Sequence, residues 1–152
     1  MSDLRRRYLN LLAGCLSREL FLDQDEPGVD PADRLEGRDW PATAETMIGR
    51  RRLDNLIDSL ATVLDDDIPG DLVETGVWRG GATILMRAAL AAWEDTDRSV
   101  WVADSFNGLP PPDPVAFPAD EGVDLSGIGT LAVSRAEVAS NFARYGLLDD
   151  RV

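Results

Sequence analysis

The 152-residue sequence predicts an α/β fold in which strands of a parallel sheet alternate with helices. Two short apolar segments, residues 71–75 and 99–104, are bounded by turn residues, as buried parallel strands are. Residues 81–93 between them are dense in Ala, Leu and Ile and indicate a helix. The order strand, helix, strand, with nearly continuous apolar runs, predicts a crossover in a parallel sheet that is covered on its faces.

Helices are predicted before this unit. Residues 3–21 predict an amphipathic helix, and residues 43–66 a second one that ends before a Pro–Gly pair. The segment between them, residues 23–42, is rich in Asp, Pro and Gly and predicts a connecting loop. Cys15 is expected to be inert core on the first apolar stripe. That stripe consists of Leu4, Tyr8, Leu11, Leu12, Cys15, Leu16 and Leu20.

The region after the second strand contains a long loop and one more helix. Residues 105–130 are too long and too rich in proline for a passive turn, which predicts a lid or a binding loop. Ser134 and Glu137 have the spacing of a capping box at a helix start, and Gly146 is placed as its left-handed end. The last residues, 149–152, are expected to approach a third strand.

Composition limits the possible functions. The formal net charge of −13 disfavours nucleic acid and anionic membrane as partners. The chain has no histidine, which excludes Ser-His-Asp and Cys-His catalytic arrangements and imidazole-ligated zinc within it. With one cysteine and no apolar stretch long enough for a signal peptide or a membrane span, a cytoplasmic protein is expected.

The segment VETGVWRGG, residues 73–81, joins the first strand to the following helix. Gly76 permits a tight turn, and the glycines at 80 and 81 permit a close approach to the first turn of the helix. Asp104 ends the second strand, where its carboxylate could accept hydrogen bonds from two ribose hydroxyls. The motif therefore predicts an adenosine-type cofactor crevice at the carboxyl ends of the strands. The alternative is a tight turn whose glycines serve packing alone.

Two residues of this motif bear on the kind of cofactor. Trp78 replaces the second glycine of a dinucleotide fingerprint, and Glu74 would repel a pyrophosphate. A carboxylate suits the cationic amino and sulfonium groups of S-adenosylmethionine, which favours methyl transfer. The alternatives are a nicotinamide-dinucleotide-binding fragment and a Glu74 that only bonds nearby amides. Arg79 is expected to be a solvated charge, or else to meet a carboxylate at the crevice rim.

Four segments, in order, resemble the macrocin O-methyltransferase (TylF/MycF) family of S-adenosylmethionine-dependent enzymes. They are ETMIGRRRLDNL, PGDLVETGVWRGGATILMRA, VWVADSFNGLPPPDP and VASNFARYGLLDDRV. The resemblance implies a Rossmann-like class I methyltransferase fold and methylation of a sugar hydroxyl on a macrolide-like natural product. It also implies a homo-oligomer and, for the full-length family member only, Mg²⁺.

The resemblance further implies site residues. Those expected at the methionine end of the cofactor are Glu74, Thr75, Gly76 and Gly80. Asp104 would hold the ribose, with Ser105 beside it. Thr46 and Met47 would close over the cofactor or the substrate. Trp40 would reach the substrate of a neighbouring subunit, or alternatively pack on its own domain.

The resemblance covers about the first three fifths of a family member, so the chain is expected to be truncated. We therefore divide it into a helical region with a loop, residues 1–68, and the N-terminal half of an S-adenosylmethionine-binding Rossmann-like domain, residues 69–152. No catalytic or metal-ligating residue is assigned. A non-catalytic remnant acting as an interaction module is the alternative, and an unpaired apolar strand edge at residues 71–75 predicts self-association.

Overall fold

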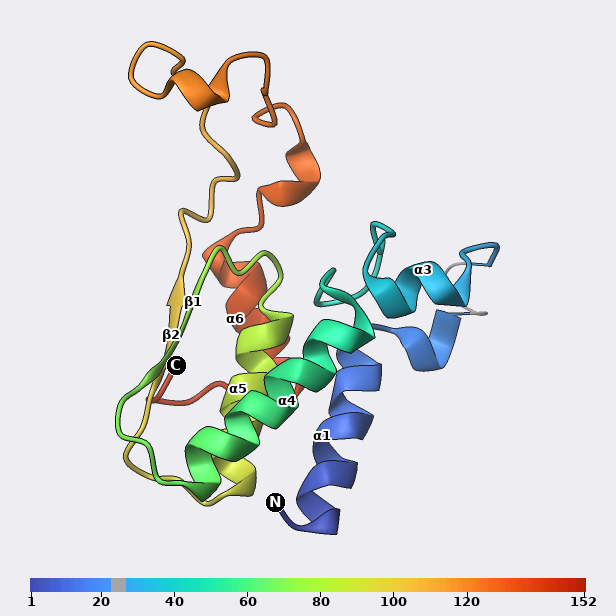
Figure 1. Ribbon diagram of the computed structural model, residues 1–152, viewed down its shortest axis with the longest axis vertical. Helices are drawn as coiled ribbons and strands as arrows, with labels where there is room; N and C mark the ends of the chain where they lie inside the picture. Colours follow the sequence, from blue (N-terminus) through green and yellow to red (C-terminus); the bar gives the residue numbers. More distant parts are fainter. Residues whose placement is uncertain (23–26) are drawn as a thin grey trace.

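Two short parallel strands lie beside a group of helices in the computed structural model, which describes residues 1–22 and 27–152 (Figure 1). The strands are β1 (Leu72–Thr75) and β2 (Val100–Ala103), and α5 (Gly81–Ala92) connects them. They pair in parallel. The α/β prediction and the order strand, helix, strand are thus confirmed.

The two faces of this sheet differ in exposure. Leu72 pairs with Val100 in register, and both side chains face inward, toward α5. The alternate side chains point the other way, so that Val73 and Trp101 are each 60% exposed. The prediction of a sheet covered on its faces is therefore wrong for the described residues, because α5 covers only one of the two faces.

The first helix, α1, spans Asp3–Leu16 and ends earlier than the predicted residue 21. Arg18 takes a left-handed conformation (φ 59°), and a 3₁₀ turn, η1 (Glu19–Phe21), follows. The buried stripe is Leu9, Leu12, Ala13 and Leu16, whereas Leu4, Leu11 and Leu20 are exposed. Cys15 is partly exposed rather than core. Leucines on several faces made the wrong stripe plausible, and contacts with other helices select the face that contains Leu9.

Part of the predicted loop 23–42 is helical. α3 spans Pro31–Glu36, with the Asp30 side chain accepting a 2.9 Å hydrogen bond from the Ala32 N–H and Gly37 closing the helix at φ 67°. Residues 23–26 of the predicted loop lie outside the described residues. The helix escaped prediction because six residues show too little periodicity, although its caps follow the usual rules.

The second predicted helix also begins later than expected. α4 spans Gly49–Asp65 and buries Leu53, Ile57 and Leu60. Residues 43–48 are not helical, because their backbone meets the start of α5, where the Gly81 N–H donates to the Glu45 carbonyl at 2.9 Å.

The last helix agrees with its sequence signals. α6 spans Arg135–Arg144, and the Ser134 hydroxyl accepts a 3.2 Å hydrogen bond from the Glu137 N–H. Gly146 has a left-handed φ of 68°. Beyond it the Arg151 carbonyl accepts from the Val100 N–H at 2.8 Å, so the chain does return to β2, although residues 149–152 form no strand.

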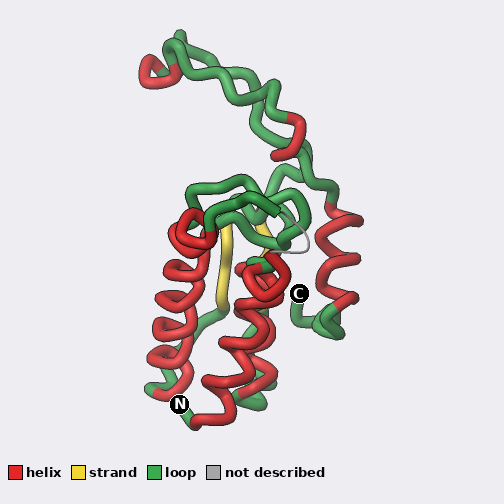
Figure 2. The backbone as a smooth tube through the Cα atoms, turned by 90° about the vertical axis from the view of Figure 1, so that its right-hand side faces the viewer, coloured by secondary structure: helices red, strands yellow, loops and turns green. Residues whose placement is uncertain are grey.

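Between β2 and α6 the chain makes a long excursion, residues 105–133, that projects beyond the helices and strands (Figures 1 and 2). It contains two 3₁₀ turns, η2 (Pro118–Asp120) and η3 (Gly129–Leu131). Several of its apolar side chains are exposed, including Val115 and Phe117. The excursion leaves and rejoins the body beside the carboxyl ends of the strands.

One apolar core joins the helices to the sheet. Its members come from α1, α4, α5, β2 and α6 and include Leu9, Ile57, Ile84, Leu85, Val100 and Phe142. Residues 1–68 and 69–152 both contribute, and the division of the chain at residue 68 remains a prediction. Among the described residues, no helix combines the length and the hydrophobicity needed to cross a bilayer.

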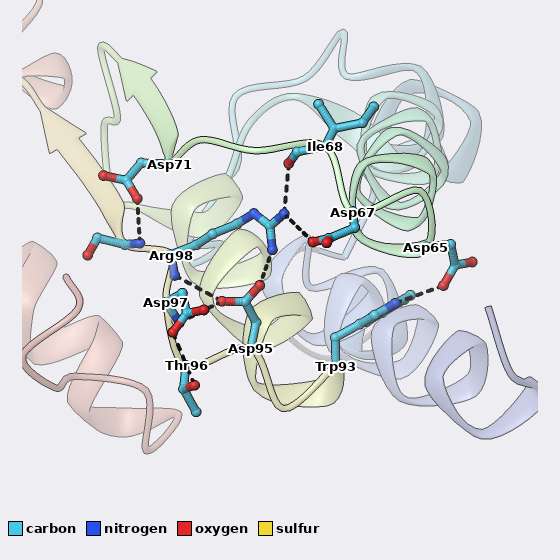
Figure 3. Close-up of polar contacts among 10 residues, drawn as sticks. Asp65, Asp67, Ile68, Asp71, Trp93, Asp95, Thr96, Asp97 and Arg98 are labelled. Carbon is cyan, nitrogen blue, oxygen red and sulfur yellow. Dashed lines mark hydrogen bonds and ion pairs between the residues drawn. The ribbon is translucent and has the colours of Figure 1, made fainter.

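A polar network fixes the amino ends of both strands (Figure 3). The Arg98 guanidinium pairs with Asp95 and donates to the Ile68 carbonyl at 2.7 Å, thereby joining the loops that precede β2 and β1. Next to it, the Asp71 carboxylate accepts from the Ser99 N–H at 3.0 Å. Because these bonds hold the loops together, the register of the two strands is fixed at the end where the chain enters them.

Gly81, at the start of α5, packs closely against residues 45 and 46. A Cβ there would lie 2.7 Å from the Glu45 carbonyl oxygen and 2.7 Å from the Thr46 Cβ. Alanine normally stabilises a helix relative to glycine, yet we expect Gly81→Ala to lower the free energy of unfolding by about 1–3 kcal/mol, because backbone atoms must move. Urea unfolding measures this, with Gly127→Ala as control, since a Cβ at Gly127 has no atom within 4 Å. A Gly81→Ala chain as stable as wild type would show that the contact yields freely.

Candidate functional site

A crevice of about 620 Å³ opens at the carboxyl ends of β1 and β2. Cavities of this size hold small molecules and cofactors. The crevice is mostly apolar, and segments far apart in the sequence contribute to it. Its lining includes Met47, Gly76, Trp78, Asp104, Ser105 and Leu131.

Asp104 is held rigidly at the edge of this crevice. One of its carboxylate oxygens accepts a 2.7 Å hydrogen bond from the Val77 N–H, and the other accepts a 2.8 Å bond from the Phe106 N–H. The carbonyl of the preceding residue, Ala103, accepts a 2.8 Å hydrogen bond from the Gly76 N–H. The carboxylate is thus fixed beside the glycine turn, and each oxygen keeps a lone pair for a further donor.

Gly76 gives the crevice an open floor. Its φ is +79°, a conformation that side chains rarely adopt, and no atom lies within 4 Å of the position that a Cβ would occupy. A ligand could therefore approach the backbone of the turn at this point.

Trp78 forms part of the wall and was not predicted to do so. It takes a left-handed φ of 50°, which is unusual for a bulky side chain. Its indole N–H donates to the Thr130 carbonyl at 2.8 Å and so ties the turn to the returning end of the excursion. The sequence signal was a tryptophan where a nucleotide-binding turn often has glycine, but nothing indicated its partner.

Glu74 lies under the turn rather than in the lining of the crevice. Because strand side chains alternate, it points to the covered face, where one carboxylate oxygen is buried without a hydrogen-bond partner among the described residues. Burial raises the pKa of Glu74 to about 7, with the charge of Asp104 adding to the shift and the Thr83 N–H opposing it. The site thus contains a carboxyl group that gains or loses a proton near neutral pH.

The other expected residues are more scattered. Ser105 lines the crevice, and its hydroxyl donates to the Gly108 carbonyl at 3.0 Å. Thr75 is exposed on the open face of the sheet. Gly80 is outside the lining of the crevice. A Cβ there would lie 3.0 Å from the side chain of Val138, so the absence of a side chain at Gly80 allows α6 to pack closely against the turn.

Residues 40–47 approach the site from the helix side. Met47 lines the crevice, whereas Thr46 is buried behind it and accepts a 3.4 Å hydrogen bond from the Ile48 N–H. Trp40 is 58% exposed and is not part of the lining. The structure therefore brings Met47, Gly76, Asp104 and Ser105 together and leaves the other expected residues around them.

Both ends of the excursion also line the crevice. Leu109 and Pro110 contribute from the outgoing end, and Leu131 from the returning end. The run of prolines predicted a binding loop, but only its ends lie at the crevice while the middle projects away from it (Figure 1). No periodicity could have indicated which of its residues return to the body.

The described residues contain no group of three or more His, Cys, Asp or Glu side chains suited to hold a metal ion. The carboxylates nearest to the crevice are Asp104, whose two oxygens accept backbone N–H groups, and the buried Glu74, so only two acidic side chains lie there among the described residues. This part of the chain does not fit a metal centre, and magnesium remains an expectation for full-length family members.

Comparisons with known proteins show which family and which fold the chain resembles. The profile of the macrocin-O-methyltransferase (TylF) family matches residues 5–152. The chain is also similar in fold to the O-methyltransferase NovP, with a TM-score of 0.91 and 45% identity over 97% of this chain and 62% of that one.

Three curated relatives are similar in sequence. The chain is 50% identical, over 99% of its length, to 8-demethyl-8-(2,3-dimethoxy-alpha-L-rhamnosyl)-tetracenomycin-C 4'-O-methyltransferase of Streptomyces olivaceus. It is 52% identical over 89% of its length to demethyldecarbamoylnovobiocin O-methyltransferase of Streptomyces niveus, and 43% identical over 95% to mycinamicin III 3''-O-methyltransferase of Micromonospora griseorubida. It spans 60%, 52% and 61% of these relatives, respectively.

Proposed function

The chain belongs to the macrocin O-methyltransferase (TylF) family, and from this premise we propose that its crevice holds S-adenosylmethionine for methyl transfer to a hydroxyl group. The acceptor we propose is a sugar hydroxyl of a glycosylated natural product, because the name of one relative describes a rhamnosyl tetracenomycin. The proposal concerns the cofactor side of the site, because the chain spans only 52–61% of the length of its curated relatives.

The observation that carries the proposal is the position of Asp104. Its carboxylate lies 2.7 Å from the Val77 N–H, directly beside the open backbone of Gly76. A carboxylate in this position at the ends of parallel strands suits the two hydroxyls of a ribose. The apolar walls formed by Met47 and Leu131 suit an adenine ring.

When bound, S-adenosylmethionine would supply a methyl group on a positively charged sulfur: the carbon–oxygen bond to the acceptor would form as the carbon–sulfur bond breaks, with S-adenosylhomocysteine leaving as a neutral thioether and the hydroxyl proton passing to water. The residues of this chain act by binding and orienting. Asp104 accepts from the ribose hydroxyls and fixes the orientation of the adenosyl group, while the apolar walls exclude water. Glu74 acts through space from beneath the turn, where its ionised form attracts a cation. We propose no catalytic residue among those described.

The remaining expected residues stay part of the proposal with lesser roles. Thr75, Gly80 and Thr46 shape the turn and its support instead of forming the wall. Trp40, which is exposed, is proposed to reach an acceptor bound between copies of the chain. A homo-oligomer is consistent with the open sheet face, where Val73 and Trp101 are exposed.

Calorimetric titration of the 152-residue chain tests the proposal. We expect saturable one-to-one binding of S-adenosylmethionine, at least about tenfold tighter than that of NAD⁺, because Glu74 and Trp78 disfavour a pyrophosphate at the turn. Tighter binding of NAD⁺ would establish the nicotinamide alternative. A folded chain that binds neither ligand, even when supplied with Mg²⁺, would contradict the proposed cofactor and favour the interaction-module alternative.

A further inference from the structure

Arg79 is not the solvated charge that its place in the turn suggests. Its side chain is 21% exposed, and its guanidinium bonds to the segment that precedes α4. One of its terminal nitrogens donates to the carbonyls of Ala42 and Ala44, each at 2.9 Å, and to that of Pro41 at 3.4 Å. The Glu137 carboxylate lies 4.0 Å from its Nε.

The segment that Arg79 holds continues to the crevice. After Ala44, the Glu45 carbonyl accepts the Gly81 N–H at 2.9 Å, and the Glu45 N–H donates to the Leu16 carbonyl at 3.0 Å. The Glu45 side chain is buried and accepts from Tyr145 at 3.1 Å. Met47 follows two residues later and lines the crevice. Its position thus depends on how residues 41–45 are fixed.

Arg79 also contacts Trp78, another residue of the crevice lining. Its guanidinium carbon lies 4.3 Å from the centroid of the Trp78 ring, within the range of a cation–π contact. The Asn141 amide donates to the Arg79 carbonyl at 2.9 Å and so anchors this part of the turn to α6. Arg79 itself is absent from the crevice lining, although it touches both Trp78 and the segment that leads to Met47.

We propose that Arg79 is a positioning residue, which holds the Met47 and Trp78 walls in place and thereby sets the affinity for an adenosyl ligand without touching it. The affinity part of this inference rests on the proposed function, whereas the positioning part concerns the free protein. The two parts can be measured separately.

The test compares Arg79→Ala and Arg79→Lys with wild type. Calorimetry with S-adenosylhomocysteine measures affinity, and NMR of the ligand-free chain follows the indole N–H of Trp78 and the methyl group of Met47. We expect Arg79→Ala to shift both signals and to weaken binding about tenfold or more. Arg79→Lys keeps a positive charge and a hydrogen-bond donor, so its NMR signals and its affinity should lie between those of wild type and Arg79→Ala. This variant remains informative if the alanine variant does not fold.

Arg52→Ala is the matched control, because it removes an exposed arginine from the surface of α4. It should leave both signals and the affinity unchanged. Wild-type binding that persists unweakened in a folded Arg79→Ala chain would overturn the role in affinity. Unshifted Trp78 and Met47 signals would overturn the positioning itself. A wild-type chain that binds no S-adenosylhomocysteine, yet shows the shifts, would contradict the proposed function and leave the positioning established.

Discussion

Replacing Asp104 by alanine is expected to lower the affinity of the chain for S-adenosylhomocysteine about a hundredfold or more. Two hydrogen bonds from ribose hydroxyls to a carboxylate are lost, each typically worth about 1.5–3 kcal/mol. The Val77 and Phe106 N–H groups also lose their acceptor, so we expect the free energy of unfolding to fall by about 1–3 kcal/mol. Calorimetry and urea unfolding measure the two effects.

Two further variants separate the ligand effect from the structural one. Asp104→Asn keeps one carbonyl oxygen and should bind about tenfold more weakly than wild type. Asp124→Ala removes another carboxylate that accepts a backbone N–H, that of Ser126 at 2.9 Å, but on the exposed excursion. It should leave the affinity unchanged. An Asp104→Ala chain that folds and binds as wild type does would exclude this carboxylate from the site.

The second large effect is a pH-dependent stability caused by Glu74. Its pKa is raised from 4.5 to about 7 in the folded chain, so the folded state keeps a proton that the unfolded state has released. The contribution of Glu74 to the free energy of unfolding is therefore most favourable below about pH 4.5, where the carboxyl group is protonated in both states. It is lost as the pH rises from 4.5 through about 7. Relative to Glu74→Gln, which cannot ionise, wild type should lose about 2–3 kcal/mol of unfolding free energy over this range.

Urea unfolding of both chains at pH 5, 6, 7 and 8 measures this difference. The exposed Glu121, on the excursion, offers a matched control, because Glu121→Gln should follow the wild-type profile at every pH. If the Glu74→Gln and wild-type stabilities ran parallel from pH 5 to 8, the Glu74 carboxyl group would not be buried in solution. The ionised form favours a cationic ligand, so S-adenosylmethionine should also bind more tightly at pH 8 than at pH 6.

The proximity of the glycine turn and Asp104 could be predicted from the sequence, because parallel strands end at the same edge of a sheet. The Val77 N–H and Asp104, which are 27 residues apart, meet at 2.7 Å as that rule requires. The helix start at Ser134 was predictable for a similar reason, since the cap is a local interaction. The two strands and this cap follow from patterns within short segments.

The features that escaped prediction depend on distant backbone. Arg79 binds backbone carbonyl groups 35 to 38 residues away. Because every residue has a backbone carbonyl, the sequence does not indicate which ones an arginine binds. Glu74 is buried because it lies on the face of the sheet that α5 covers. Alternation within β1 shows that Glu74 and Val73 face opposite sides, but it does not show which side a helix covers. The stripe of α1 was assigned wrongly because the packing of other helices, not its own periodicity, selects Leu9 over Leu11.

The central claim is that Asp104 recognises the ribose of an adenosyl ligand, and a thermodynamic cycle tests it most directly. Calorimetry would compare S-adenosylhomocysteine with its 2′,3′-dideoxy analogue on wild type and on Asp104→Asn. Removing the hydroxyls should weaken binding to wild type about a hundredfold or more and to the variant about tenfold less than that, because Asp104→Asn has already lost part of the same contact. An equal loss on both chains would contradict the claim, since the hydroxyls would then be bound elsewhere.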